Sequence, residues 1–84
     1  MKIEILGTGC AKCKELEART KEALKQVGGF HSIEKVEDIT KIMEYGVMST
    51  PGFVVDGKVI STGKLLTVDE IVKILKMPLK ENNG

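Results

Sequence analysis

The chain has 84 residues, of which 42% are hydrophobic, and a formal net charge of +1. This length allows one domain with a modest core, and the near-neutral charge argues against the concentrated basic face that a nucleic-acid-binding domain requires. No apolar stretch is long enough to span a membrane and the first residues lack a leader pattern, so we expect a cytoplasmic protein without membrane contact.

Hydrophobic periodicity and turn residues divide the chain into seven expected elements. In chain order these are a strand at Lys2–Leu6, a helix at Ala11–Val27, a strand at His31–Val36, a helix at Ile39–Tyr45, two strands around Phe53–Val55 and Val59–Ile60, and a helix that begins at Val68. Asp38 is expected to cap the second helix, and Thr67 forms a capping box with Glu70 before the third. Asp56-Gly57 is the preferred pair for a tight hairpin turn. We expect residues 1–77 to form the domain and residues 78–84 to form a flexible tail.

The order β-α-β-α-β-β-α predicts an α/β fold in which helices cover both faces of a four-stranded mixed sheet. We expect the first three strands to be parallel neighbours joined by right-handed crossovers, with the hairpin adding an antiparallel edge strand. In open α/β sheets, chemistry gathers at the carboxyl ends of the strands. Cys10 follows the carboxyl end of the first predicted strand, so the motif and the topology agree.

The chain contains two cysteines, Cys10 and Cys13, separated by Ala11-Lys12 at the start of the first predicted helix. Two thiols at this spacing can close a disulfide or share a soft metal ion. The unpaired N–H groups and the dipole of a helix start favour a thiolate. A C-x-x-C motif between a strand and a helix therefore indicates redox chemistry. Because Cys13 falls on the apolar stripe of the helix, we expect it to be buried and Cys10 to be exposed.

Two other functions of the cysteine pair stay open. Heavy-metal-associated domains also place a C-x-x-C at a strand-to-helix junction, and two thiolates suit Cu(I) or Zn(II). Those domains have the order β-α-β-β-α-β, however, and two thiols are too few for a closed zinc site. In the second alternative, the chain is a non-catalytic adaptor whose cysteine pair senses the redox state.

A second motif follows the predicted second helix: Tyr45-Gly46-Val47-Met48-Ser49-Thr50-Pro51 leads into an apolar strand. Together with Gly9–Cys13, it makes the chain resemble the thioredoxin superfamily, most closely the small redox-active disulfide proteins of archaea and anaerobic bacteria. The resemblance covers Lys2 to about Lys76. It implies a thioredoxin-like fold and a thiol–disulfide oxidoreductase without a bound cofactor. It also implies protein disulfide substrates, an external disulfide reductase or glutathione as electron donor, and a monomeric chain.

The resemblance assigns roles by position. It implies that Cys10 is the nucleophile, that Cys13 is the resolving cysteine, and that Pro51 follows a cis peptide bond beside them. The residues that it implies for substrate contact are Gly9, Ala11, Lys12, Thr50, Pro51 and Gly63.

One acidic residue also matches the family pattern. Thioredoxins have a buried acid six residues before the first cysteine, and Glu4 occupies that place. The resemblance implies that Glu4 accepts the proton of Cys13. The alternative is a Glu4 that is solvated, or paired with Lys2 or Lys35.

Overall fold

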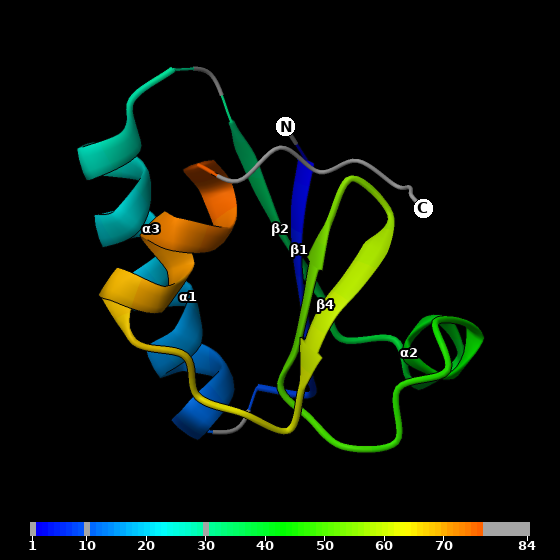
Figure 1. Ribbon diagram of the computed structural model, residues 1–84. Helices are drawn as coiled ribbons and strands as arrows, with labels where there is room; N and C mark the ends of the chain where they lie inside the picture. Colours follow the sequence, from blue (N-terminus) through cyan, green and yellow to red (C-terminus); the bar gives the residue numbers. More distant parts are fainter. Residues whose placement is uncertain (1, 10, 30, 77–84) are drawn as a thin grey trace.

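The computed structural model of the chain describes residues 2–9, 11–29 and 31–76. Its elements are β1 (Lys2–Leu6), α1 (Ala11–Val27), β2 (Ser32–Val36), α2 (Ile39–Glu44), β3 (Gly52–Val55), β4 (Lys58–Thr62) and α3 (Val68–Lys76). The strands form one mixed sheet in the order β2-β1-β3-β4. Helices α1 and α3 lie on one face of the sheet and α2 lies on the other (Figure 1). The predicted element order and the two-sided helical cover are confirmed, whereas the expected tail at 78–84 lies outside the described residues. Among the helices of the described part, none is long and apolar enough to cross a membrane.

The direction of β3 differs from the expectation. Strands β1 and β2 are parallel, but β3 is antiparallel to β1, with Leu6 at the end of β1 opposite Gly52 at the start of β3. The reason is the short connection, because α2 has six residues and is about 9 Å long, whereas a strand of five residues spans about 16 Å. Helix α2 does not carry the chain back to the amino ends of β1 and β2 (Figure 1). The prediction of three parallel strands is wrong, and the antiparallel β3–β4 hairpin is confirmed.

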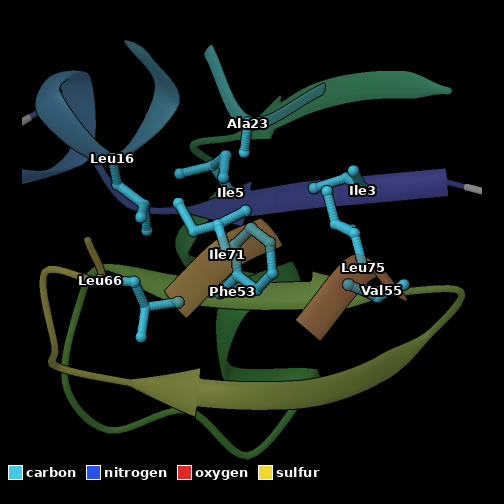
Figure 2. Close-up of a cluster of buried hydrophobic side chains, with 9 residues drawn as sticks. All are labelled: Ile3, Ile5, Leu16, Ala23, Phe53, Val55, Leu66, Ile71 and Leu75. Atoms are coloured by element: carbon cyan, nitrogen blue, oxygen red, sulfur yellow. The ribbon is translucent and has the colours of Figure 1, made fainter. Parts of the chain in front are cut away.

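Two hydrophobic clusters hold the layers together. Alternation along β1 sends Ile3 and Ile5 to the face covered by α1 and α3. Figure 2 shows this larger cluster, which consists of Ile3, Ile5, Leu16, Ala23, Phe53, Val55, Leu66, Ile71 and Leu75. The smaller cluster joins the opposite face to α2 and consists of Leu6, Val36, Ile42, Val47 and Val54. Side chains at positions 4 and 6 of β1 therefore face α2, and those at positions 3 and 5 face α1 and α3.

Local hydrogen bonds define the helix ends that the sequence predicted. The Asp38 carboxylate accepts a hydrogen bond from the Thr40 N–H at 2.9 Å, which caps α2. Thr67 and Glu70 bond each other reciprocally at 2.9 and 3.1 Å before α3, which confirms the capping box. Helix α2 ends one residue earlier than expected, and Tyr45 is its C-cap residue.

The strands also differ slightly from the predicted ranges. Strand β2 begins one residue later than expected, because the His31 ring closes the preceding loop by donating from Nε2 to the Gly28 carbonyl oxygen at 2.8 Å. The β3–β4 turn is formed as predicted by Asp56 and Gly57, with φ angles of 51° and 82°. Two successive positive φ angles are what a two-residue hairpin turn of this hand requires.

Candidate functional site

Cys13 is the cysteine that the structure describes, whereas Cys10 lies outside the described residues. Cys13 stands in the first turn of α1 and is 5% exposed. It begins the buried stripe of this helix, followed at helical spacing by Leu16, Thr20 and Ala23. The predicted burial of Cys13 is therefore confirmed, and its side chain points from α1 toward the end of β1.

The absence of a side chain on Gly7 leaves room for the sulfur of Cys13 beside the end of β1. A Cβ atom on residue 7 would overlap Cys13 Sγ and would stand 3.2 Å from Cys13 Cβ. Ordinary contacts between such atoms are about 3.5–4.0 Å, so a side chain at this position would displace the sulfur. The Gly7 N–H also donates to the Val36 carbonyl oxygen at 2.9 Å, which ties the end of β1 to the end of β2.

Thr50 and Pro51 approach the same place from the segment before β3. Thr50 Cβ lies 3.8 Å from the point where a Cβ on Gly7 would stand, so Thr50 and Cys13 both border Gly7. The peptide bond between Thr50 and Pro51 is cis. Pro51 is buried, whereas Thr50 is exposed. The two predicted motifs, distant in sequence, therefore meet at one end of the sheet.

Gly63 directly follows β4 and lies at the same end of the sheet. Its N–H donates to the Pro51 carbonyl oxygen at 2.8 Å, and its φ is +66°. A Cβ on Gly63 would stand 2.9 Å from the Ser49 Cβ, which is too close for a non-bonded pair. A residue without a side chain is therefore needed at position 63, because the backbone there packs closely against Ser49. The sequence analysis did not identify this structural reason for the glycine.

The remaining predicted contact residues lie at the start of α1. Ala11 and Lys12 are exposed, and Gly9 is partly buried with a φ of +87°. The first turn of α1 contains no acidic residue, and it carries the lysines Lys12 and Lys14. These positive charges and the unpaired N–H groups of the helix start favour the thiolate form of a cysteine at this position over the thiol.

Glu4 is buried, but the structure places it with Tyr45 and not with Cys13. Glu4 is 7% exposed, and its carboxylate accepts a hydrogen bond of 2.5 Å from the Tyr45 hydroxyl. This carboxylate lines a hollow of about 440 Å³ beside α2. Cys13 belongs to α1, on the opposite face of the sheet. The geometry therefore gives no support to a direct proton transfer between Glu4 and Cys13.

The alternative partners expected for Glu4 are also engaged elsewhere. Lys2 Nζ lies 3.7 Å from Glu34 Oε1, and Lys35 Nζ lies 3.7 Å from Glu17 Oε1. The hydrogen bond with Glu4, and its negative charge, raise the pKa of Tyr45 above the ordinary value. The sequence analysis missed this pair because the two residues are 41 positions apart and meet only when α2 packs on the sheet.

A second hollow, of about 20 Å³, lies beside Cys13. It is lined by Ile5, Gly7, Gly9, Cys13, Lys14, Lys35 and Glu37. Lys35 is opposite Ile5 in the register of β1 and β2, and Glu37 Oε2 lies 3.8 Å from the point where a Cβ on Gly9 would stand. The sequence analysis missed Lys35 and Glu37 as neighbours of Cys13. These neighbours could have been inferred from the parallel pairing that it expected for β1 and β2, because that pairing brings residue 37 next to the end of β1.

Comparisons with known proteins agree with this arrangement. A family model described as a thioredoxin domain matches residues 1–76. A thioredoxin of Methanothermobacter thermautotrophicus is 43% identical over 75 residues, which cover 89% of this chain and 97% of the relative. A thioredoxin of Methanocaldococcus jannaschii is 38% identical over 78 residues, covering 93% of this chain and 90% of the relative.

Proposed function

Because the chain belongs to the thioredoxin family, we propose that it is a thiol–disulfide oxidoreductase that exchanges disulfides with protein substrates through Cys10 and Cys13. The observation that carries this proposal is the position of Cys13, which is buried against Gly7 where the cis bond before Pro51 reaches the end of the sheet. A resolving cysteine needs such a place. It has to reach the sulfur three residues earlier and yet be shielded from outside disulfides.

In the proposed reaction, the Cys10 thiolate attacks one sulfur of a substrate disulfide. A bond forms between Cys10 and that sulfur, the substrate disulfide breaks, and the other substrate sulfur leaves as a thiolate that takes up a proton. Cys13 then loses its proton and attacks the Cys10 sulfur, which releases the second substrate thiolate and closes a Cys10–Cys13 disulfide. The substrate gains two electrons, and an external disulfide reductase or glutathione returns two electrons to the protein.

The start of α1 supplies the activation that this chemistry needs. An ordinary thiol, with a pKa of about 8.5, is only a few per cent thiolate at neutral pH. A thiol that is half ionised at pH 7 requires about 2 kcal/mol of stabilisation of its charged form. The helix start, with Lys12 and Lys14 and without an acidic residue in its first turn, provides charges and dipoles of the right sign.

The exposed residues around the site fit an extended polypeptide as substrate. Thr50 is exposed next to Pro51, and Gly63 presents a backbone without a side chain on the other side of Pro51. Met48 is 96% exposed, so an apolar side chain of the protein stands in solvent two residues before Thr50. We propose that Thr50 and Gly63 contact the backbone of the substrate and that Met48 contacts its apolar side chains. We further propose that the chain works as a monomer in the cytoplasm, where such thiols are kept reduced.

Insulin reduction with dithiothreitol tests the proposal. We expect the wild-type chain to accelerate the reduction and Cys10→Ser to abolish the acceleration. Cys13→Ser is expected to accumulate mixed disulfides that Cys10→Ser does not form. A wild-type chain that leaves the rate unchanged would contradict the proposal and favour a redox sensor. Tight binding of Cu(I) or Zn(II) without disulfide exchange would favour a metal-binding module.

A further inference from the structure

The proposed reaction requires a group that removes the proton of Cys13. The thiolate is the attacking species, and only a few per cent of an ordinary thiol is in the thiolate form at neutral pH. Cys13 is 5% exposed, so bulk water has little access to its sulfur. A base held within hydrogen-bond reach, or within reach through one water, is the usual solution.

Glu4 is badly placed for this task. Its side chain leaves β1 on the α2 face, where Tyr45 donates a hydrogen bond to its carboxylate. Cys13 stands on α1, across the sheet, and the two residues line different hollows. A proton that leaves Cys13 would have to pass the backbone of β1 to reach Glu4.

Glu37 is placed on the same side as Cys13. The hydrogen bond from the Gly7 N–H to the Val36 carbonyl oxygen fixes the end of β2 beside the end of β1, and Glu37 is the next residue. Glu37 lines the small hollow together with Cys13, and its Oε2 approaches Gly9. Glu37 is also exposed, so a proton that it receives can pass on to solvent.

The hollow has the size of one water molecule. Its volume is about 20 Å³, and a cavity needs about 10–15 Å³ of such space to hold a water, which also needs two to four polar partners. The residues that line it include Glu37, Cys13, Lys14 and Lys35, whose side chains can all take part in hydrogen bonds. A water in this hollow would lie between residues that include both the proton donor, Cys13, and the acceptor, Glu37.

We propose that Glu37, and not Glu4, accepts the proton of Cys13 through one water in this hollow. The inference rests on the proposed function, because Cys13 has to release a proton only if it resolves a mixed disulfide. As the proton passes from the Cys13 sulfur to the water, the water gives one of its own to Glu37. The Cys13 thiolate then attacks the Cys10 sulfur, the bond from Cys10 to the substrate breaks, and the substrate thiolate leaves. Glu37 afterwards loses the proton to solvent.

The surrounding charges make the proposal sharply testable. Lys14 on α1 and Lys35 on β2 line the hollow, and the charge of Lys35 is partly balanced by Glu17. Removing the negative charge of Glu37 leaves these lysines. Through electrostatics alone, this change would favour the Cys13 thiolate and accelerate resolution. Loss of a proton acceptor has the opposite effect, because it slows resolution.

The reaction with 5,5′-dithiobis(2-nitrobenzoate) separates the two steps. Attack by Cys10 releases one thionitrobenzoate in a phase that depends on reagent concentration, and resolution by Cys13 releases a second in a phase that does not. In stopped-flow measurements, we expect Glu37→Gln to slow the second phase about tenfold at pH 7 and to leave the first phase within about twofold. At pH 9.5 the thiol ionises without help, so the second-phase rates of the variant and the wild type should converge. Glu37→Asp should recover part of the loss.

The matched control is Glu34→Gln, which removes the same charge from β2, three residues before Glu37 and on the opposite face of the sheet, where residue 34 is paired with residue 4. We expect it to leave the second phase and its pH profile as in the wild type. An unchanged or faster second phase in Glu37→Gln would overturn the proposal, and so would a slowing only in Glu4→Gln. Wild-type chain that shows no second phase would instead contradict the proposed function, since Cys13 would not be a resolving cysteine.

Discussion

Replacing Gly7 with alanine probes how tightly the sheet holds the sulfur of Cys13. A Cβ on residue 7 would overlap Cys13 Sγ and would stand 3.2 Å from Cys13 Cβ. Since ordinary contacts need about 3.5–4.0 Å, the sulfur has to move by about 1 Å or more. The φ angle of Gly7 is not in the positive region, so alanine adds no backbone strain at this position. The steric contact with Cys13 is the penalty that remains.

The expected loss of stability follows from overpacking at a buried site. Extra atoms in a packed interior cost about 1–3 kcal/mol, and alanine recovers about 0.4–1 kcal/mol by restricting the unfolded chain. The net destabilisation should be about 1–2 kcal/mol. For a domain of this size that corresponds to a fall in Tm of roughly 4–16 °C, measurable by thermal or urea unfolding of the reduced protein.

The kinetic effect of Gly7→Ala should be larger than the thermodynamic one. A displacement of about 1 Å in a reacting group can cost about a hundredfold in rate, so the second thionitrobenzoate phase should slow by about that factor while the first phase persists. Gly52→Ala is the control, because its Cβ would press on the Leu6 side chain at 3.1–3.3 Å and not on Cys13. A Gly7→Ala protein with wild-type stability and a wild-type second phase would refute the role assigned to Gly7.

Three further predictions concern the described contacts. Tyr45→Phe removes the hydroxyl that donates to buried Glu4 and should cost about 1.5–3 kcal/mol of stability in urea unfolding. The pKa of Tyr45 in the folded protein is raised, so the wild type should lose this stabilisation as the pH rises through that pKa, above 10. An equal loss of stability at alkaline pH in Tyr45→Phe would contradict this prediction. Thr67→Ala removes the acceptor for the Glu70 N–H and should lower the free energy of unfolding by about 1 kcal/mol, and an unchanged urea midpoint would argue against the capping box as a stabilising element. Met48→Lys should raise the KM for insulin without slowing the reaction with the small aromatic disulfide, whereas equal effects on both would remove Met48 from the substrate surface.

The sequence by itself determined the secondary-structure elements and the family. The period of apolar residues, the capping residues and the Asp56-Gly57 turn are local signals, and each local structure formed as predicted or within two residues of it. The two cysteines and the segment that ends at Pro51 were sufficient to identify the family, since both motifs are contiguous in the chain. Burial of Cys13 also followed from its place on the helical stripe.

Only the tertiary structure decided which residues surround Cys13 and on which side of the sheet each charge lies. Glu4 meets Tyr45 because α2 packs on one face of β1, and Glu37 lines the same hollow as Cys13 because β2 ends beside Gly7. The short helix predicted before β3 already argued against a crossover to a parallel strand, but the pairing of β3 with β1 is a contact that only the fold shows. These contacts join residues far apart in sequence. They are set by packing of whole layers, which selects one pairing of elements from several that the local signals allow.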